Sequence, residues 1–137
     1  MRLLALDIGD RWTGTAISDE LGIFARPYKT IKTHLIKEFL QTLISQENIQ
    51  TIVAGLPKTM RGKESQQTKK TKEFVQKLKH FIPTTDWILW DERLTSKQAR
   101  SIHQSRKKNK QDIHSIAAAL ILGSYLDHLY LQKTHHT

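Results

Sequence analysis

Cysteine is absent from the 137 residues of the chain. This absence excludes disulfide bonds, zinc ribbons and a thiol nucleophile, and it is compatible with a reducing compartment. Long apolar runs are missing too, since no stretch approaches the roughly 20 residues that span a membrane. The apolar run at residues 3–6 is interrupted by Asp7 and Asp10 and lacks the features of a secretory signal peptide. We therefore expect a cytoplasmic protein with no membrane partner.

Acidic residues are fewer than basic ones. The chain has 13 Asp and Glu and 22 Lys and Arg, which gives a formal net charge of +9. A basic balance of this size attracts polyanions, although solubility alone explains it in many small proteins. The hydrophobic share of 38% is enough for a core, and the length is that of one ordinary domain. We therefore expect one domain over residues 1–137, with nucleic acid as the partner that its charge favours.

Hydrophobic periodicity predicts the order of strands and helices. Apolar runs bounded by turn residues predict strands at 3–7, 15–18, 23–28, 51–54 and 87–90. Helical spacing predicts helices at about 33–44, 64–80 and 113–131, with a short additional helix at 95–99. Three strands followed by helix–strand units predict an α/β fold with a five-stranded mixed sheet and helices on both faces.

Some details of these elements are predictable from single residues. Thr33 is a candidate N-cap of the first helix. Trp87 and Trp90 belong to an apolar strand, so we expect them in the core. One stripe of the last helix should face the sheet, and it consists of Ile113, Ile116, Ala117, Leu120 and Ser124.

Acidic side chains follow two of the predicted strands. Asp7 ends the first strand, and Asp91 and Glu92 end the last. Ligands of open α/β sheets bind beyond the carboxyl ends of the strands, so these carboxylates converge if the two strands are near neighbours. Adjacent carboxylates repel, and a hard divalent cation relieves that repulsion. One such acid alone is more often a turn residue or a cap, but two in a small basic domain favour a metal site.

Four segments occur in an order and spacing that resemble a known family. They are LDIGDRWTGTAISD at 6–19, GLP at 55–57 followed by Met60 and Gly62, DERLTS at 91–96, and SIAAALIL at 115–122 followed by Tyr125 and Leu126. They resemble the motifs of the YqgF family, whose members are described as Holliday junction resolvase-like proteins and as candidate pre-16S ribosomal RNA nucleases. The resemblance spans nearly the whole chain and implies an RNase H-like fold with a catalytic site at the centre of the sheet.

The resemblance also implies roles for single residues. Asp7 corresponds to the family's first metal-binding acid, and Glu92 to the second, whereas Asp91 is expected to support the site or to cap the helix that follows. The family's third acid begins the last helix, where this chain has His114. Asp112 is close, but two positions turn a helix by about 200°, so Asp112 and His114 do not easily aim at one point.

The departure at His114 leaves three interpretations open. His114 is a metal ligand or proton carrier, and its imidazole then favours Mn²⁺ over Mg²⁺. Alternatively, Asp112 reaches the metal from a frayed first turn, although the N-cap of the helix is its more ordinary role. In the third interpretation the site is weakened, His114 is only a polar residue at a helix end, and the protein mainly binds RNA.

Basic residues near the predicted site are candidates for binding nucleic acid. The loop after the fourth strand carries Lys58, Arg61 and Lys63, which would flank the metal site and neutralise phosphates. Further candidates that could extend this groove are Arg11, Arg93, Arg106, Lys107, Lys108 and Lys110. We interpret the lysines between Lys69 and Lys79 as the solvated face of a helix. Trp12 either stacks on a base or packs in the core.

The predicted function is phosphodiester hydrolysis by two Mg²⁺ or Mn²⁺ ions, in the processing of ribosomal RNA precursors. Resemblance alone favours structured RNA as the partner over branched DNA, and we expect a monomer or a weak dimer. The alternatives are a Holliday junction resolvase and a non-catalytic RNA-binding or ribosome assembly factor. An actin-like kinase or ATPase also opens on a strand followed by Asp-x-Gly, but such proteins need two lobes, for which this chain is too short.

Overall fold

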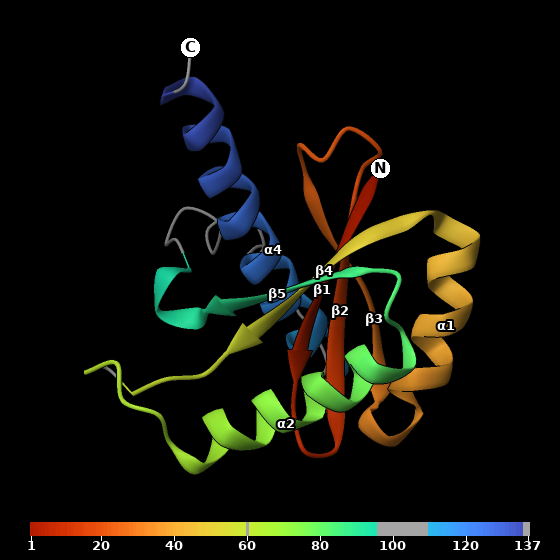
Figure 1. Cartoon of the computed structure of the whole chain (residues 1–137), viewed down its shortest axis with the longest axis vertical. Helices are drawn as coiled ribbons and strands as arrows, with labels where there is room; N and C mark the ends of the chain where they lie inside the picture. Colours follow the sequence, from red (N-terminus) through yellow and green to blue (C-terminus); the bar gives the residue numbers. More distant parts are fainter. Residues whose placement is uncertain (60, 96–109, 136–137) are drawn as a thin grey trace.

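The structure is a computed structural model that describes residues 1–59, 61–95 and 110–135, without the side chains of 110–112 and 134–135. Its strands form one five-stranded sheet in the order β3-β2-β1-β4-β5 (Figure 1). The strands are β1 (Arg2–Ile8), β2 (Trp12–Ser18), β3 (Ala25–Lys32), β4 (Ile49–Leu56) and β5 (Asp86–Asp91). The helices are η1 (Thr33–Leu35), α1 (Ile36–Glu47), α2 (Gln66–Phe81), η2 (Glu92–Leu94) and α4 (Lys110–His135).

The sheet is mixed, as the sequence predicted. β1 and β2 pair antiparallel, and so do β2 and β3, whereas β4 pairs parallel with β1 and with β5. Parallel neighbours require a crossover, which α1 supplies before β4 and α2 supplies before β5. The carboxyl ends of β1, β4 and β5 therefore meet at one edge, where a ligand site of this kind of sheet is expected.

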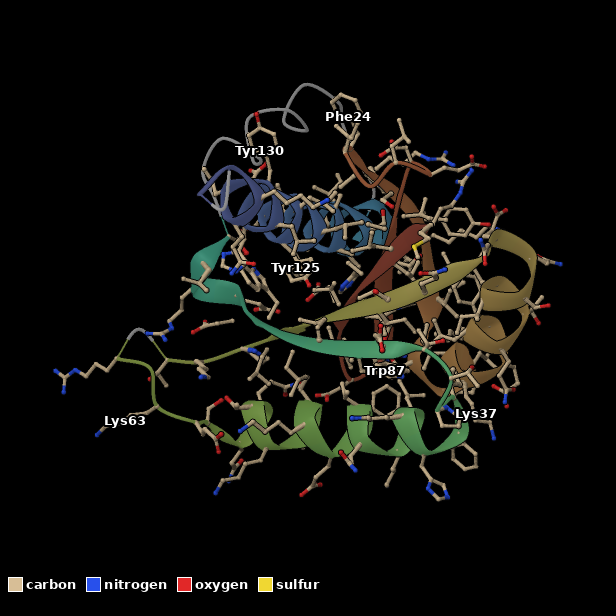
Figure 2. All side chains as sticks on the ribbon, turned by 45° about the horizontal axis from the view of Figure 1, so that its top comes forward. Phe24, Lys37, Lys63, Trp87, Tyr125 and Tyr130 are labelled. Atoms are coloured by element: carbon tan, nitrogen blue, oxygen red, sulfur yellow. The ribbon has the colours of Figure 1, made fainter. Side chains whose placement is uncertain are left out.

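Helices cover both faces of the sheet, and each face has its own apolar cluster (Figure 2). Leu4 and Leu6 of β1 point into the cluster beneath α1 and α2. Ala5 points the other way, into a cluster with Ala118 and Leu122 of α4. β1 and β4 are thus buried on both faces, which explains their nearly continuous apolar sequence. The predicted five-stranded sheet with helices on both faces is confirmed.

The outer strand β3 differs from the prediction. It runs over Ala25–Lys32 instead of residues 23–28, because its pairing with β2 continues as far as Trp12 opposite Lys32. The register shifts between Gly14 and Ala16, and Pro27 lies opposite Ala16 in the resumed pairing. A proline is tolerated here because the described part of the chain provides no further strand beyond β3 to which it could donate.

Thr33 is not the N-cap of a helix, so that prediction is wrong. The residue opens η1, and its hydroxyl donates to the carbonyl oxygen of Gly9 at 2.7 Å. It also lies 2.9 Å from the hydroxyl of Thr13. Thr33 therefore ties the start of the first helical segment to the β1–β2 turn. The predicted short helix at 95–99 falls almost entirely on 96–109, outside the described residues.

The buried stripe predicted for α4 is largely wrong, since Ser124 is the one residue of that stripe that is buried. Ile113 is 57% exposed, whereas the small residues Ser115, Ala118 and Ala119 are buried. The helix comes closest to the sheet near its start, where small side chains are buried, and farther along it buries the large side chains of Ile121, Leu122 and Leu126. None of the helices in the described part of the chain is both long and apolar enough to span a membrane.

Candidate active site

Asp7 lies near the carboxyl end of β1, on the face that α4 covers. Side chains alternate along a strand, so Asp7 faces the same way as Ala5, whose cluster contains α4 residues. Gly14 of β2 lies directly opposite Asp7 in the antiparallel register. The space around the Asp7 carboxylate is therefore bounded by β2, by β4 and by the first turns of α4.

Glu92 reaches this space across β4, because Gly55 has no side chain there. Ala54 pairs with Leu6, so Gly55 lies beside Asp7 on the neighbouring strand. A Cβ atom built on Gly55 would lie only 2.8 Å from Oε1 of Glu92. The glycine thus leaves room for the Glu92 carboxyl group, and the predicted convergence of the two strand ends occurs although β1 and β5 are not adjacent.

The two carboxyl groups share a proton. Burial raises the pKa of Asp7, while the positive charge of His114 and a hydrogen bond from Glu92 oppose that rise. Burial, the charge of Asp7 and the hydrogen bond to it raise the pKa of Glu92 to about 7. Below about pH 7 Glu92 therefore holds a proton that it donates to the Asp7 carboxylate. Two half-buried acids in this state are typical of a site that exchanges protons for a cation.

His114 lies in the first turns of α4, next to this pair. A Cβ atom on Gly14 would come within 1.9 Å of the main-chain oxygen of His114, so the helix touches the sheet at Gly14. The contact brings His114 close enough for its charge to lower the pKa of Asp7. The described residues nevertheless include no group of three or more Asp, Glu or His side chains that could hold a metal ion together. The side chain of Asp112 lies outside the described part.

Asp91 caps the short helix η2. Capping the helix that follows was one of the two roles expected for this residue. Its carboxylate accepts from the main-chain N–H of Arg93 at 2.9 Å and forms an ion pair with the Arg93 guanidinium at 2.6 Å. Hydrogen bonds from Arg93 lower the pKa of Asp91. The pair fixes η2, and with it the position of Glu92. Gly62, with φ +81°, lies beneath the same guanidinium, since a Cβ there would be 3.1 Å from one of its nitrogens.

The other basic candidates differ in their exposure and in how close they lie to the carboxylate pair. Lys58 is partly buried and close enough to contribute to the low pKa of Asp91. Arg61 and Lys63 are exposed in the loop between β4 and α2, and Lys63 projects away from the sheet (Figure 2). Arg11 is exposed in the β1–β2 turn. The remaining candidates fall outside the described side chains and are Arg106, Lys107, Lys108 and Lys110.

The tryptophans lie half-buried. Trp87 packs against the α1/α2 cluster and donates its indole N–H to the carbonyl oxygen of Ile82 at 3.1 Å. Trp90 packs against the α4 cluster with its ring 5.3 Å from that of Tyr125. Both are core contacts, as predicted. Trp12 is half-buried at the start of β2.

Sequence reasoning missed the roles of two glycines. Gly14 is part of the first quoted segment and was given no role of its own, but it lies within β2 and lets α4 approach the sheet. Gly55 was recognised only as part of a motif, but it makes room for Glu92. A signal was present for Gly14, since the run Ala117–Ala118–Ala119 in the last helix permits close packing against a neighbouring backbone, but none was present for Gly55.

Comparison with known proteins identifies the family. The sequence model of the RuvX family, described as "Holliday junction resolvase", matches residues 1–128. A protein of Sulfurihydrogenibium sp. (strain YO3AOP1) named "Putative pre-16S rRNA nuclease" is 43% identical over 132 residues, covering 93% of this chain and 91% of that protein. A protein of the same name from Clostridium tetani (strain Massachusetts / E88) is 41% identical over 137 residues, with coverage of 95% and 99%.

Solved structures show the fold. RuvC of Thermus thermophilus superimposes with a TM-score of 0.60 over 93% of this chain and 96% of that one, at 12% sequence identity. The same protein in complex with a Holliday junction substrate gives the same values. The predicted RNase H-like fold is thereby confirmed. Because the family model and the similar sequences cover nearly the whole chain, the family prediction is confirmed too, and the chain belongs to the RuvX family, of which YqgF is another name.

Proposed function

We propose that the chain is a metal-dependent nuclease that hydrolyses phosphodiester bonds at the Asp7–Glu92 pair. The observation that carries the proposal is the contact of these two carboxyl groups at the carboxyl ends of the strands, with Glu92 protonated up to about pH 7. The name of the curated relatives and the description of the family support the nuclease class. The basic surface of the chain, with a net charge of +9, suits a polyanionic substrate.

The residues present fit a hard divalent cation. Two half-buried carboxyl groups that already share a proton have oxygen ligands to offer once that proton leaves. Oxygen donors favour Mg²⁺ or Mn²⁺, and we assign Asp7 and Glu92 as ligands, with His114 or Asp112 completing the set. When bound, a pair of such ions supplies an activated water and stabilises the leaving oxygen of a phosphodiester.

The chain's own residues prepare this chemistry. Asp7 is held by β1, and Glu92 by the Asp91–Arg93 pair that fixes η2. The missing side chain of Gly55 keeps the floor of the site open. His114 lies beside Asp7, where its charge lowers the pKa of that carboxyl group. Lys58 and Arg93 lie near Asp91, and their positive charges can orient the phosphates of the strand that is cut.

We further propose that the substrate is a ribosomal RNA precursor and that the chain acts in the cytoplasm as a single domain. The curated relatives carry the name of pre-16S rRNA nucleases, which supports RNA. A second candidate is the resolution of branched DNA, which the description of the family favours. A symmetric resolvase works as a dimer, so a stable dimer in solution would favour the second candidate, and a monomer or weak dimer the first.

Cleavage of structured RNA and of a four-way DNA junction, each with Mg²⁺ or Mn²⁺, tests the proposal. We expect metal-dependent cleavage of RNA by the unaltered chain. Asp7→Asn should reduce the rate by at least about a hundredfold, because it removes a charged ligand from the site without changing its shape. RNA binding in EDTA and the thermal melting curve of Asp7→Asn serve as controls and should change little.

His114→Asp separates the interpretations of the third ligand. If His114 occupies a ligand position, an aspartate there should raise activity in Mg²⁺ relative to Mn²⁺. An unchanged metal preference would remove His114 from the site. If the unaltered chain binds RNA tightly but cleaves no substrate with either metal, the nuclease proposal fails, and the non-catalytic RNA-binding alternative takes its place.

A further inference from the structure

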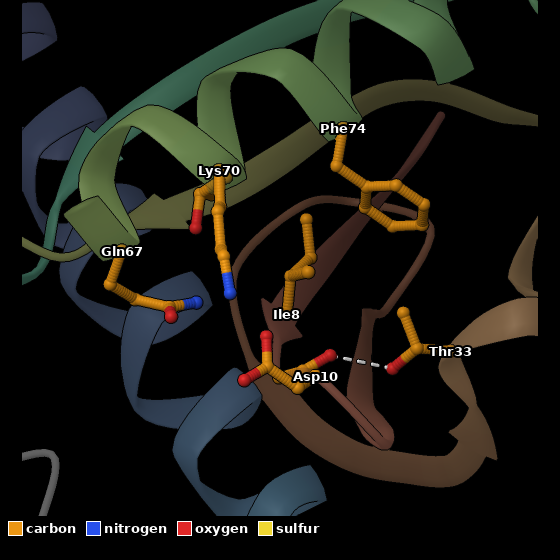
Figure 3. Close-up of a pocket in the computed structure, with 8 residues that line it drawn as sticks. Ile8, Asp10, Thr33, Gln67, Lys70 and Phe74 are labelled. Carbon is orange, nitrogen blue, oxygen red and sulfur yellow. Dashed lines mark hydrogen bonds between the residues drawn. The ribbon is translucent and has the colours of Figure 1, made fainter.

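A small pocket opens on the face of the sheet opposite the carboxylate pair. It lies between the β1–β2 turn and the first half of α2 and has a volume of about 150 Å³. The residues that shape it are Ile8, Asp10, Gln67, Lys70, Thr71 and Phe74 (Figure 3). The pocket shares none of its residues with the Asp7–Glu92 pair.

The pocket is nevertheless a near neighbour of that pair. Ile8 follows Asp7 in β1, and successive side chains of a strand point to opposite faces. Asp10 is three positions after Asp7, and a chain of that length spans about 10 Å at most. A nucleic-acid strand with a phosphate at Asp7 therefore has a base within reach of the pocket, because stacked bases are about 3.4 Å apart along a strand.

The walls of the pocket combine an apolar side with a polar end. Phe74 and Ile8 form the apolar side. Figure 3 shows the side chains of Gln67 and Lys70 pointing from α2 toward Asp10. Neither Asp10 nor Lys70 has an ion-pair partner among the residues that the structure describes. The pocket thus presents a carboxylate, an ammonium and an amide to one small space beside an aromatic ring.

A second observation concerns a polar atom in the wall of the pocket. The hydroxyl oxygen of Thr71 is buried and has no hydrogen-bond partner in the described part of the chain. The residue itself is 1% exposed and belongs to the lining. Buried polar atoms are normally paired, so this hydroxyl adds an unsatisfied polar atom to the inner wall of the pocket, behind the groups that a ligand would contact.

We propose that this pocket binds one unpaired nucleobase of the substrate strand. A base is flat, and its faces suit the apolar wall of Phe74 and Ile8, while its edge carries donors and acceptors for the polar end. An amino group of the base would donate to Asp10, and a ring nitrogen or carbonyl would accept from Lys70. The inference rests on the proposed nuclease function for its role beside the site, but not for the binding itself.

The opposite charges of Asp10 and Lys70 favour a neutral base over a charged ligand. A phosphate group would face the carboxylate of Asp10, and a cation would face the ammonium of Lys70. A neutral group that both donates and accepts satisfies the two together. Cytosine, adenine and guanine carry an amino group beside one acceptor. The ring N–H of uracil also donates, but it lies between two carbonyl oxygens, which would be held against the Asp10 carboxylate. We therefore expect the pocket to disfavour uracil.

Binding of short unstructured oligonucleotides in EDTA tests the pocket without cleavage. Fluorescence anisotropy with oligocytidine and oligouridine of equal length, as RNA and as DNA, gives the affinities of the full chain. We expect cytidine to bind roughly tenfold more tightly than uridine, as one well-placed polar pair discriminates between bases. Asp10→Asn should weaken the binding of oligocytidine, although the loss of a negative charge would strengthen the binding of phosphates alone.

Lys70→Gln and Lys77→Gln form a matched pair, because both lysines are exposed on α2 and only Lys70 lines the pocket. Lys70→Gln should abolish the preference for cytidine, and Lys77→Gln should retain it. Equal binding of cytidine and uridine oligomers, or stronger binding by Asp10→Asn, would overturn the proposal. Base-selective binding without cleavage would reject the nuclease function alone, whereas cleavage without base selectivity would reject the pocket alone.

Discussion

At the scale of single residues, the site depends on the absence of a side chain at Gly55. β4 lies between the two strands that carry the acids, and any side chain on its α4 face at this point would separate them. A Cβ on Gly55 would meet Oε1 of Glu92 at 2.8 Å and Cδ1 of Ile121 at 2.5 Å. Both atoms are far ends of flexible side chains, so they can move aside without unfolding the protein.

Gly55→Ala should therefore impair the site more than the fold. We expect the Glu92 carboxyl group to be displaced from Asp7, so that affinity for Mn²⁺ falls by about tenfold or more. The free energy of unfolding should drop by only about 1–3 kcal/mol, as for other tightly packed insertions. Titration calorimetry with Mn²⁺ and urea denaturation measure the two effects. Unchanged metal affinity in a folded Gly55→Ala protein would contradict the assigned role of Gly55.

The raised pKa of Glu92 predicts a pH dependence of stability. The folded state holds this proton up to about pH 7, whereas a glutamate in the unfolded chain loses it near pH 4.3. Between these values the folded state binds more protons, so stability decreases as the pH rises. Without added metal we expect the urea midpoint to fall between about pH 5 and pH 7.5.

Glu92→Gln is the control for this prediction, because it keeps the shape of the side chain and cannot lose a proton. Its urea midpoint should change less over the same pH range. Metal affinity of the unaltered chain should change in the opposite direction, since a cation competes with the proton and binds better above about pH 7. A midpoint that is independent of pH in both proteins would show that Glu92 titrates normally.

At the scale of elements, the contact of α4 with β2 determines where His114 lies. A Cβ on Gly14 would come within 1.9 Å of a main-chain oxygen, which cannot move without the helix. The buried small residues Ser115, Ala118 and Ala119 continue the close contact along α4. The start of the helix is thus positioned by backbone proximity, and its later turns by the buried side chains of Ile121, Leu122 and Leu126.

Gly14→Ala should consequently displace the start of α4. We expect the free energy of unfolding to fall by about 3 kcal/mol or more, since the obstacle is backbone and not a flexible side chain. Urea denaturation measures the loss. An NMR titration of His114 gives a second readout, because the distance from its imidazole to Asp7 should change in any folded fraction. A loss below about 0.5 kcal/mol would contradict the close packing.

The order of the elements could be predicted from the sequence, but their exact contacts could not. Apolar runs located all five strands, and those of β1 and β4 are nearly continuous because both faces of these strands are buried. The extension of β3 to Lys32 was missed because alternation is weak in an outer strand. The stripe of α4 was misassigned because the face that is buried, with Ala118, Ile121 and Leu122, is rotated by one or two positions from the predicted one, and apolar residues on both faces made the two hard to distinguish.

At the scale of the whole molecule, charge rather than shape sets the affinity for nucleic acid. The net charge of +9 acts on any polyanion, and each neutralised phosphate adds to the salt dependence of binding. The exposed loop residues Arg61 and Lys63 follow β4, whose end forms part of the site. Lys77 and Lys79 lie near the C-terminal end of α2, so they are farther in sequence from the end of β4 than Arg61 and Lys63 are.

Arg61→Gln combined with Lys63→Gln should reduce the salt dependence of RNA binding. For single strands the slope of log affinity against log salt falls by about 0.7 for each phosphate that the protein no longer neutralises, so we expect a change of about 1.4. Anisotropy titrations at several salt concentrations measure the slope. The matched control is Lys77→Gln with Lys79→Gln, which removes the same charge from the far end of α2. Equal changes in both double variants would show that only total charge matters.

The candidate site was predictable in part. Asp7 and Glu92 were identified from strand ends and from the family resemblance, and the structure brings them into contact. Their dependence on Gly55 was not predictable, because a pattern along the chain does not show which strand lies between two others. The pocket at Asp10 and Lys70 was missed for the same reason, since a turn and a helix distant in sequence form it.

The outer strand β3 has a consequence for how the protein behaves at high concentration. It combines Pro27, a register shift and the exposed side chains of Arg26, Lys29 and Lys32. A proline cannot donate to an added strand, and a row of positive charges repels an identical row on another copy. This border of the sheet is therefore a poor template for strand-by-strand aggregation, and exchanging Pro27 and Lys29 for threonine would remove two of its safeguards.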